Sequence, residues 1–163
     1  MKKALCGFVL VMILFACGCE KQENQAENSK SSQDYVTLVC SKTIEEDDQK
    51  ETETYEIVSK DNLIKKVTVT SVSEMDSETI DFTISFSELL TKAFNEVDGI
   101  DMTFSKEGDN TLKSVMSIDY EKINMEQAEE KLGDLFDAEE FLSEKDLSVD
   151  DFKAQNLEGY ECN

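Results

Sequence analysis

Residues 52–74, TETYEIVSKDNLIKKVTVTSVSE, are the centre around which this 163-residue chain is organised. Two runs, 52–60 and 63–74, are dense in Thr, Val, Ile and Tyr, which is the composition of β-strands. Asp61 and Asn62 stand between them, and both residue types favour tight turns. The stretch therefore predicts two antiparallel strands joined by a short turn.

An earlier run, residues 35–43, adds a third strand. Val36, Leu38 and Cys40 share one face of an extended chain, and Tyr35, Thr37 and Val39 share the other. The acidic run 45–48 that follows lacks the spaced ligands and the glycine of a calcium-binding loop. We interpret it as a solvated hairpin tip and not as a cation site. The tip would join the first strand to the second, and the three strands would then form a meander.

The next segment predicts the first helix. Ile80, Phe82 and Ile84 alternate, which favours a short extended piece before it. Ser85 and Glu88 have the spacing of a capping box, and Asp98 with Gly99 ends the pattern. The apolar positions at helical spacing are Phe86, Leu89, Leu90, Ala93, Phe94 and Val97. We expect this apolar stripe to pack on the sheet.

The remaining chain predicts a second hairpin and then two helices. One set of inward-facing residues is Ile100, Met102 and Phe104, followed after a turn at 108–110 by Leu112, Ser114, Met116, Ile118 and Tyr120. Asn124 with Gln127 caps a helix that carries Met125, Ala128, Leu132, Leu135 and Phe136. Phe141, Leu142 and Leu147 lead to a last helix, capped by Ser148, with Phe152 and Leu157 facing inward. The order β-β-β-α-β-β-α-α predicts an α+β fold, an antiparallel sheet with helices packed on one face.

The N-terminal segment predicts the location of the protein. Lys2 and Lys3 precede an apolar run that is too short to span a membrane, as in a secretory signal. Residues 14–17, LFAC, fit the lipobox of bacterial lipoproteins, with Cys17 as the lipid acceptor and Cys19 as the alternative. We expect a signal peptide at 1–16, a lipidated disordered tether at 17–34 and one globular domain at 35–163, anchored at the extracytoplasmic face of a bacterial cell membrane. Ordinary secretion with incidental cysteines is the competing interpretation.

Composition narrows the classes of function. The formal charge is −21, and removal of Lys2 and Lys3 with the signal leaves −23. Such a charge disfavours nucleic acid and favours cationic partners. The chain contains no His, Arg, Trp or Pro, which excludes His-based catalysis and the usual zinc sites. We therefore expect no cofactor and no metal site.

Two cysteines bracket the predicted domain. Cys40 and Cys162 lie beyond the membrane, where a disulfide is favoured over a catalytic pair. The bridge would close a loop of about 120 residues, worth roughly 5 kcal/mol in the chain-entropy model. Two free thiols are the alternative. A redox role would use Cys19, Cys40 or Cys162, but no two of them have the CxxC spacing.

An enzymatic function would rest on carboxylates. Asp119 with Glu121 is the pair considered, at the end of a predicted strand. Carboxylates at a strand edge are mostly solvated, so we expect no catalytic residue and no enzyme activity. The prediction is a non-enzymatic binding or envelope-associated module with a protein or small-molecule ligand. The alternatives are weak capture of cations by the acidic surface and, less favoured, a small carboxylate hydrolase.

One string carries a resemblance to a known family. Residues 115–123, VMSIDYEKI, resemble the TIDYxK segment of the YehR-type lipoproteins, small bacterial lipoproteins of unknown function. The hairpin around Lys60 and Asp61, the helix ending before Gly99 and the acid-rich final helix are similar as well. The resemblance covers roughly residues 35–131. It implies a lipid-anchored domain of sheet plus helix and brings no catalytic residues.

Overall fold

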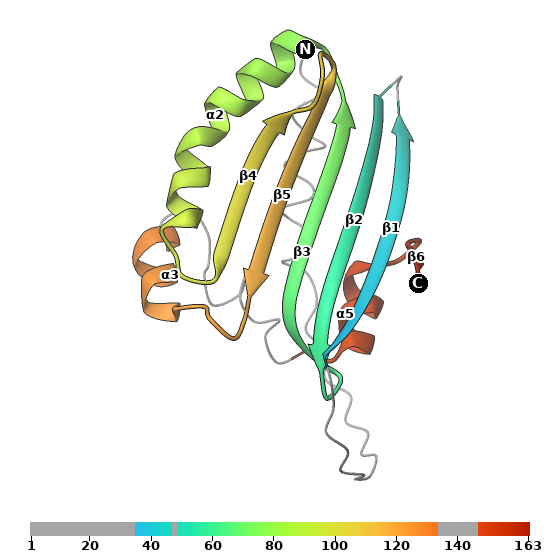
Figure 1. Cartoon of the computed structure of the whole chain (residues 1–163), viewed down its shortest axis with the longest axis vertical. Coiled ribbons are helices and arrows are strands. Elements are labelled where there is room, and N and C mark those ends of the chain that lie inside the picture. The colour runs from blue at the N-terminus through green and yellow to red at the C-terminus, as the bar shows by residue number, and fades with distance from the viewer. Residues whose placement is uncertain (1–34, 47–48, 134–146) are drawn as a thin grey trace.

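The computed structural model describes residues 35–46, 49–133 and 147–163 of the chain (Figure 1). The strands are β1 (Val36–Glu46), β2 (Gln49–Lys60), β3 (Leu63–Glu74), β4 (Ile100–Lys106), β5 (Thr111–Asp119) and β6 (Glu161–Cys162). The helices are α2 (Ser77–Asn95), α3 (Met125–Leu132) and α5 (Val149–Asn156). All neighbouring strands are antiparallel, in the order β4-β5-β3-β2-β1-β6. The predicted α+β fold with an antiparallel sheet is confirmed.

The turn between β2 and β3 is the one that the sequence predicted. Asp61 and Asn62 have φ values of 57° and 62°, the left-handed conformation that a two-residue hairpin turn of type I′ requires. Lys60 pairs with Leu63 across this turn. Asp and Asn tolerate that conformation better than other residues with a side chain, so they suit this turn. The pairing of β2 with β3 shifts register once, between Val58 and Ser59.

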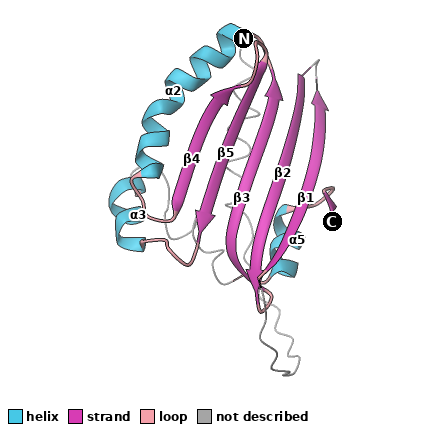
Figure 2. Ribbon diagram, viewed as in Figure 1, coloured by secondary structure: helices cyan, strands magenta, loops and turns pink. Residues whose placement is uncertain are grey.

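The two faces of the sheet differ in composition. The buried face is mainly apolar, and strand pairing places its inward side chains side by side. Its members include Cys40, Tyr55, Ile57, Val67, Val69, Ile100, Met102 and Ile118. The opposite face carries Thr54, Thr70, Val115 and Thr103 in one row across four strands. Helix α5 passes behind β1 and β2, and α2 runs beside the β4 edge of the sheet (Figure 2).

Helix α5 closes the buried face over the first strands. The ring of Phe152, which is fully buried, meets that of Tyr55 edge to face at 6.2 Å between centroids. Ser148 caps the helix by accepting the N–H of Asp151 at 3.1 Å, as predicted. Gly159 then has a φ of 80° and redirects the chain toward β1.

Two expectations about α2 are wrong. Ile80, Phe82 and Ile84 lie inside the helix and not in an extended piece, since the helix begins at Ser77. The predicted capping residue Ser85 is also internal, and its hydroxyl donates to the carbonyl of Asp81, one turn earlier. The helix ends at Asn95, shortly before the predicted end at Asp98 and Gly99.

Several expectations hold and several fall outside the described residues. The second hairpin, β4 with β5, is confirmed, and so is the cap of α3, where Asn124 accepts the N–H of Gln127 at 3.1 Å. The short strand β6 was not predicted. The expectations for residues 1–34, 47–48 and 134–146, including those on Leu135, Phe136, Phe141 and Leu142, lie outside the described part of the chain.

Candidate functional site

Helix α2 has two apolar sides, of which only one is used by the core. Ile80, Ser87 and Phe94 recur every seven residues and are buried. On another side of the helix, Phe82, Phe86 and Leu89 are exposed by 61, 67 and 77%. The prediction that Phe86 and Leu89 pack on the sheet is therefore wrong. We call Phe82, Phe86 and Leu89 the α2 stripe.

The three members of the α2 stripe form one continuous surface. Their spacings of four and three residues place them on the same side of the helix. The rings of Phe82 and Phe86 are stacked, with centroids 6.2 Å apart and planes 15° apart. Single exposed apolar residues are normal, but adjacent large ones mark surfaces that contact other molecules. The α2 stripe is the candidate functional site of the described chain.

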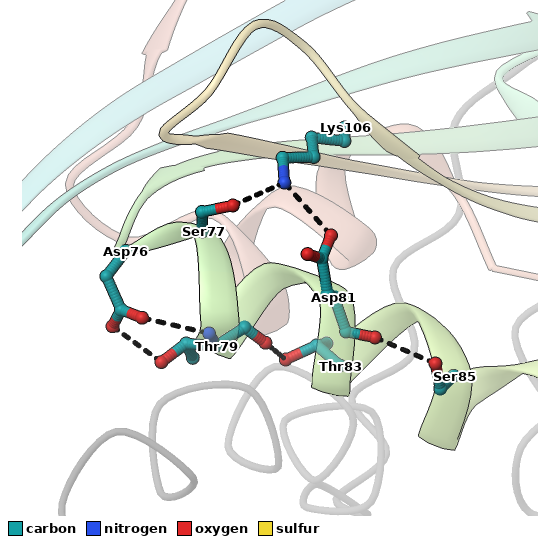
Figure 3. A network of polar contacts seen from close by, with 7 residues as sticks. All are labelled: Asp76, Ser77, Thr79, Asp81, Thr83, Ser85 and Lys106. Atoms are coloured by element: carbon teal, nitrogen blue, oxygen red, sulfur yellow. Dashed lines mark hydrogen bonds and ion pairs between the residues drawn. The ribbon is translucent and has the colours of Figure 1, made fainter.

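Asp76 fixes the start of α2. Its carboxylate accepts the backbone N–H of Thr79 at 3.0 Å and the Thr79 hydroxyl at 2.6 Å (Figure 3). The bonds from the Thr79 side chain and backbone favour the charged form and lower the pKa of Asp76. This cap satisfies a helix N–H group that would otherwise have no partner within the helix.

Side chains at both ends of α2 attach the helix to β4. Near its start, Lys106 donates to the Ser77 hydroxyl at 2.6 Å and pairs with Asp81 at 2.9 Å (Figure 3). Near its end, the Asn95 amide bonds both the N–H and the carbonyl of Met102, at 2.6 and 2.9 Å. The α2 stripe lies between these two attachments, so it is presented by a helix that is fixed at each end.

Charges of both signs lie along the α2 helix beside the stripe. Within the described residues, neither Glu78 nor Glu88 has a lysine within 4.0 Å. The nearest basic side chain on the helix, Lys92, lies 3.9 Å from Glu96. Glu78, one turn before Phe82, and Lys92, three residues after Leu89, are therefore the charged neighbours of the α2 stripe along the helix.

The structure places the predicted carboxylates Asp119 and Glu121 in separate contacts. Asp119 pairs with Lys122 at 2.6 Å, and this hydrogen bond raises the pKa of Lys122. Glu121 accepts the hydroxyl of Tyr35 at 3.0 Å, which raises the pKa of Tyr35. Each carboxylate thus has its own hydrogen-bond partner.

The sequence analysis did not predict a buried polar contact between Glu53 and Tyr160. Glu53 is buried on the covered face of β2 and accepts the hydroxyl of Tyr160. Burial raises the pKa of Glu53 and also the pKa of Tyr160. The hydrogen bond that Tyr160 donates to Glu53 raises the pKa of Tyr160 further. Alternation along β2 puts Glu53 on the same face as Tyr55 and Ile57, and that was the available signal.

The structure places two of the predicted cysteines, Cys40 and Cys162. Cys40 and Cys162 are direct neighbours in the pairing of β1 with β6, and a disulfide joins them across 122 residues of sequence. Cys17 and Cys19, the predicted lipid acceptors, lie outside the described residues.

In residues 35–46, 49–133 and 147–163, no group of three or more Cys, Asp or Glu side chains could hold a metal ion. No helix in the same ranges is long and apolar enough to cross a membrane.

Comparison with known proteins adds information about the fold. The chain matches the NMR structure of a protein from Streptococcus pneumoniae TIGR4 with a TM-score of 0.53 and 15% identity. The match covers 91% of this chain and 99% of the other. No protein-family model matches the sequence, and no curated protein matches it either. The likeness is one of fold alone, and the resemblance to YehR-type lipoproteins stays a prediction.

Proposed function

We propose that this protein is a lipid-anchored extracytoplasmic lipoprotein that acts as a non-enzymatic binding module. The observation that carries the binding role is the α2 stripe, a stacked apolar surface that the core of the described chain does not use. A surface of this kind favours contact with another molecule over solvent.

The proposed location is supported by two further features. Residues 1–17 have the order of a lipoprotein signal, with Cys17 as the acceptor of the lipid and Cys19 as the alternative. The bridge between Cys40 and Cys162 fits an oxidising compartment, where disulfides form and persist. The high negative charge of the chain suits a domain held at a surface without binding to anionic lipid.

Site-specific photo-crosslinking in intact cells tests the binding role. A photoreactive residue at position 86 should give a discrete protein adduct that Phe82→Ser with Leu89→Ser abolishes. The same photoreactive residue at position 56, which is exposed on the opposite face of the sheet, is the control. If position 86 gives no adduct, or only adducts that position 56 gives as well, the proposed binding role is wrong.

A further inference from the structure

We infer that Asn95 closes the free edge of β4 and thereby prevents a second copy of this chain from pairing its own β4 there. Within the described sheet, β4 has a strand on one side only, where β5 pairs with it. The backbone groups on the other side of such an edge strand can pair with an extended segment of another chain. This contact lies outside the α2 stripe and does not depend on the proposed binding function.

The Asn95 amide occupies the place that a neighbouring strand would take. Its Oδ1 accepts the N–H of Met102 at 2.6 Å, and its Nδ2 donates to the carbonyl of Met102 at 2.9 Å. Two residues that face each other in an antiparallel pair of strands exchange the same two bonds. The side chain of Asn95 therefore satisfies both backbone groups of Met102 in the way that a partner strand would.

The opposite edge of the sheet shows the same arrangement. At β1, the N–H of Val39 donates to the carbonyl of Asn163 at 3.2 Å, and the N–H of Asn163 donates to the carbonyl of Val39 at 3.0 Å. The disulfide between Cys40 and Cys162 holds this contact in place. A residue from outside the long strands thus occupies the pairing position at each edge.

Access to β4 requires a movement of α2. The helix runs beside the β4 edge, and Asn95 is its last residue (Figure 2). The N–H of Ile100 donates to the carbonyl of Val97 at 3.1 Å, so the chain turns from α2 into β4 within a few residues. A second β4 can reach the edge only after the last turn of α2 has moved away. The two bonds from Asn95 to Met102 oppose that movement.

The charges of β4 favour antiparallel pairing with a second copy. Asp101 lies near the start of the strand and Lys106 at its end, so two antiparallel β4 strands bring opposite charges together. Two parallel strands would align like charges. Thr103 and Ser105, which are exposed between these two residues, add no charge. The net charge of −21 opposes any association of two copies, so added salt should favour it.

Photo-crosslinking of the full-length chain in intact cells tests the inference, with a photoreactive residue at position 103 on β4. A covalent adduct of two chains reports pairing at this edge, and exposed position 56 on β2 is the control for random contact. The natural protein should give little two-chain adduct from position 103. Asn95→Ala should give roughly fivefold more, and Asn95→Asp, which keeps the acceptor for the Met102 N–H, should give an intermediate amount.

A control variant and two measurements on purified protein separate edge pairing from general loosening. Lys106→Met detaches the start of α2 from β4 but keeps the bonds from Asn95, so it should give no more adduct than the natural protein. Association of Asn95→Ala in detergent solution should increase when salt is raised from low to moderate concentration. Amide hydrogen exchange in the β2–β3 hairpin should be the same in the natural protein and in Asn95→Ala, since the sheet itself stays folded.

Three results would overturn the inference. The first is a folded Asn95→Ala protein that gives no more two-chain adduct than the natural protein. The second is equal adduct from Lys106→Met and Asn95→Ala, and the third is an adduct from position 56 that increases as much as that from position 103. If Asn95→Ala loses the protection of the β2–β3 hairpin, Asn95→Asp decides: more adduct than in the natural protein supports the inference, and no increase rejects it.

Discussion

At the scale of single residues, Glu53 is the clearest case of a side chain shaped by its surroundings. It lies 3% exposed on a face otherwise occupied by Tyr55 and Ile57, and the hydroxyl of Tyr160 is its hydrogen-bond donor. A buried carboxylate without a hydrogen-bond partner would lower the stability of the fold. The Tyr160 hydroxyl reduces that loss by donating a hydrogen bond to Glu53. The contact also joins β2 to the C-terminal segment.

The raised pKa of Glu53 predicts a pH dependence of stability. Burial is the largest cause and raises the pKa, while Tyr160 and Lys42 act against it. Because the folded pKa lies above the unfolded value of about 4.3, the stability contributed by the neutral carboxyl is full below that value and is lost as the pH rises through the folded pKa. Glu53→Gln, which stays neutral, should therefore gain stability relative to the natural protein when the pH is raised from about 4 to about 8.

Denaturant unfolding at the two pH values measures this difference, with Glu56→Gln on the same strand as the exposed control. The control should show no such gain. A Glu53→Gln variant that loses stability relative to the natural protein as the pH rises would show that the ionised carboxylate is the favoured form in the fold.

At the scale of elements, sequence patterns predicted the strands well and the first helix poorly. The hairpins carry their own local information, because the Asp61 and Asn62 turn and the alternating residues agree with each other. In α2, Ile80, Phe82 and Ile84 alternate by chance and are poor helix formers, so the pattern resembled a strand. The contacts that stabilise the helix there, above all those of Lys106, come from β4 and were invisible to local patterns.

The candidate site was missed for a related reason. A helix with apolar residues on two sides gives a broad periodic signal, and nothing in the sequence says which side meets the sheet. Phe86 and Leu89 were assigned to the core because they share helical spacing with Phe94. Only the packing of α2 against β4 shows that the α2 stripe faces outward.

Lys106→Met tests the attachment of α2 to β4. The substitution removes the ion pair with Asp81 and the bond to Ser77, and we expect a loss of about 1 kcal/mol in the free energy of unfolding. Amide hydrogen exchange should become faster in the first two turns of α2 and stay unchanged at Asn95. Lys113→Met, which removes the exposed pair with Glu107 at 3.2 Å, is the matched control and should leave α2 unaffected. Protection of α2 that is equal in the two variants would rule out the proposed role of Lys106.

At the scale of the whole molecule, the disulfide joins the first and last strands of the described domain. Cys40 and Cys162 bring β1 and β6 together, so the chain ends beside the strand with which the domain begins. Such a long closed loop restricts the unfolded chain strongly. The bridge therefore supports the sheet edge that the two-residue strand β6 could hardly maintain alone.

Replacing both cysteines, as Cys40→Ser with Cys162→Ser, should lower the free energy of unfolding by about 2–5 kcal/mol. Peptide mass mapping of the native protein without reductant should show the two cysteines joined and protected from alkylation. Cys40→Ser alone should expose Cys162 to alkylation, which serves as the internal control. If both thiols of the native protein react freely, the bridge is not formed in solution.

For the whole molecule, we propose that a lipid on Cys17 holds this domain at the membrane, and metabolic labelling with radioactive palmitate tests this proposal most directly. The natural chain should be labelled and found in the membrane fraction, whereas Cys17→Ser should be unlabelled and absent from that fraction. Cys19→Ser, the matched control, should keep both properties. Labelling that survives Cys17→Ser and disappears in Cys19→Ser would move the anchor to the alternative cysteine. A natural chain that takes up no lipid would contradict the claim.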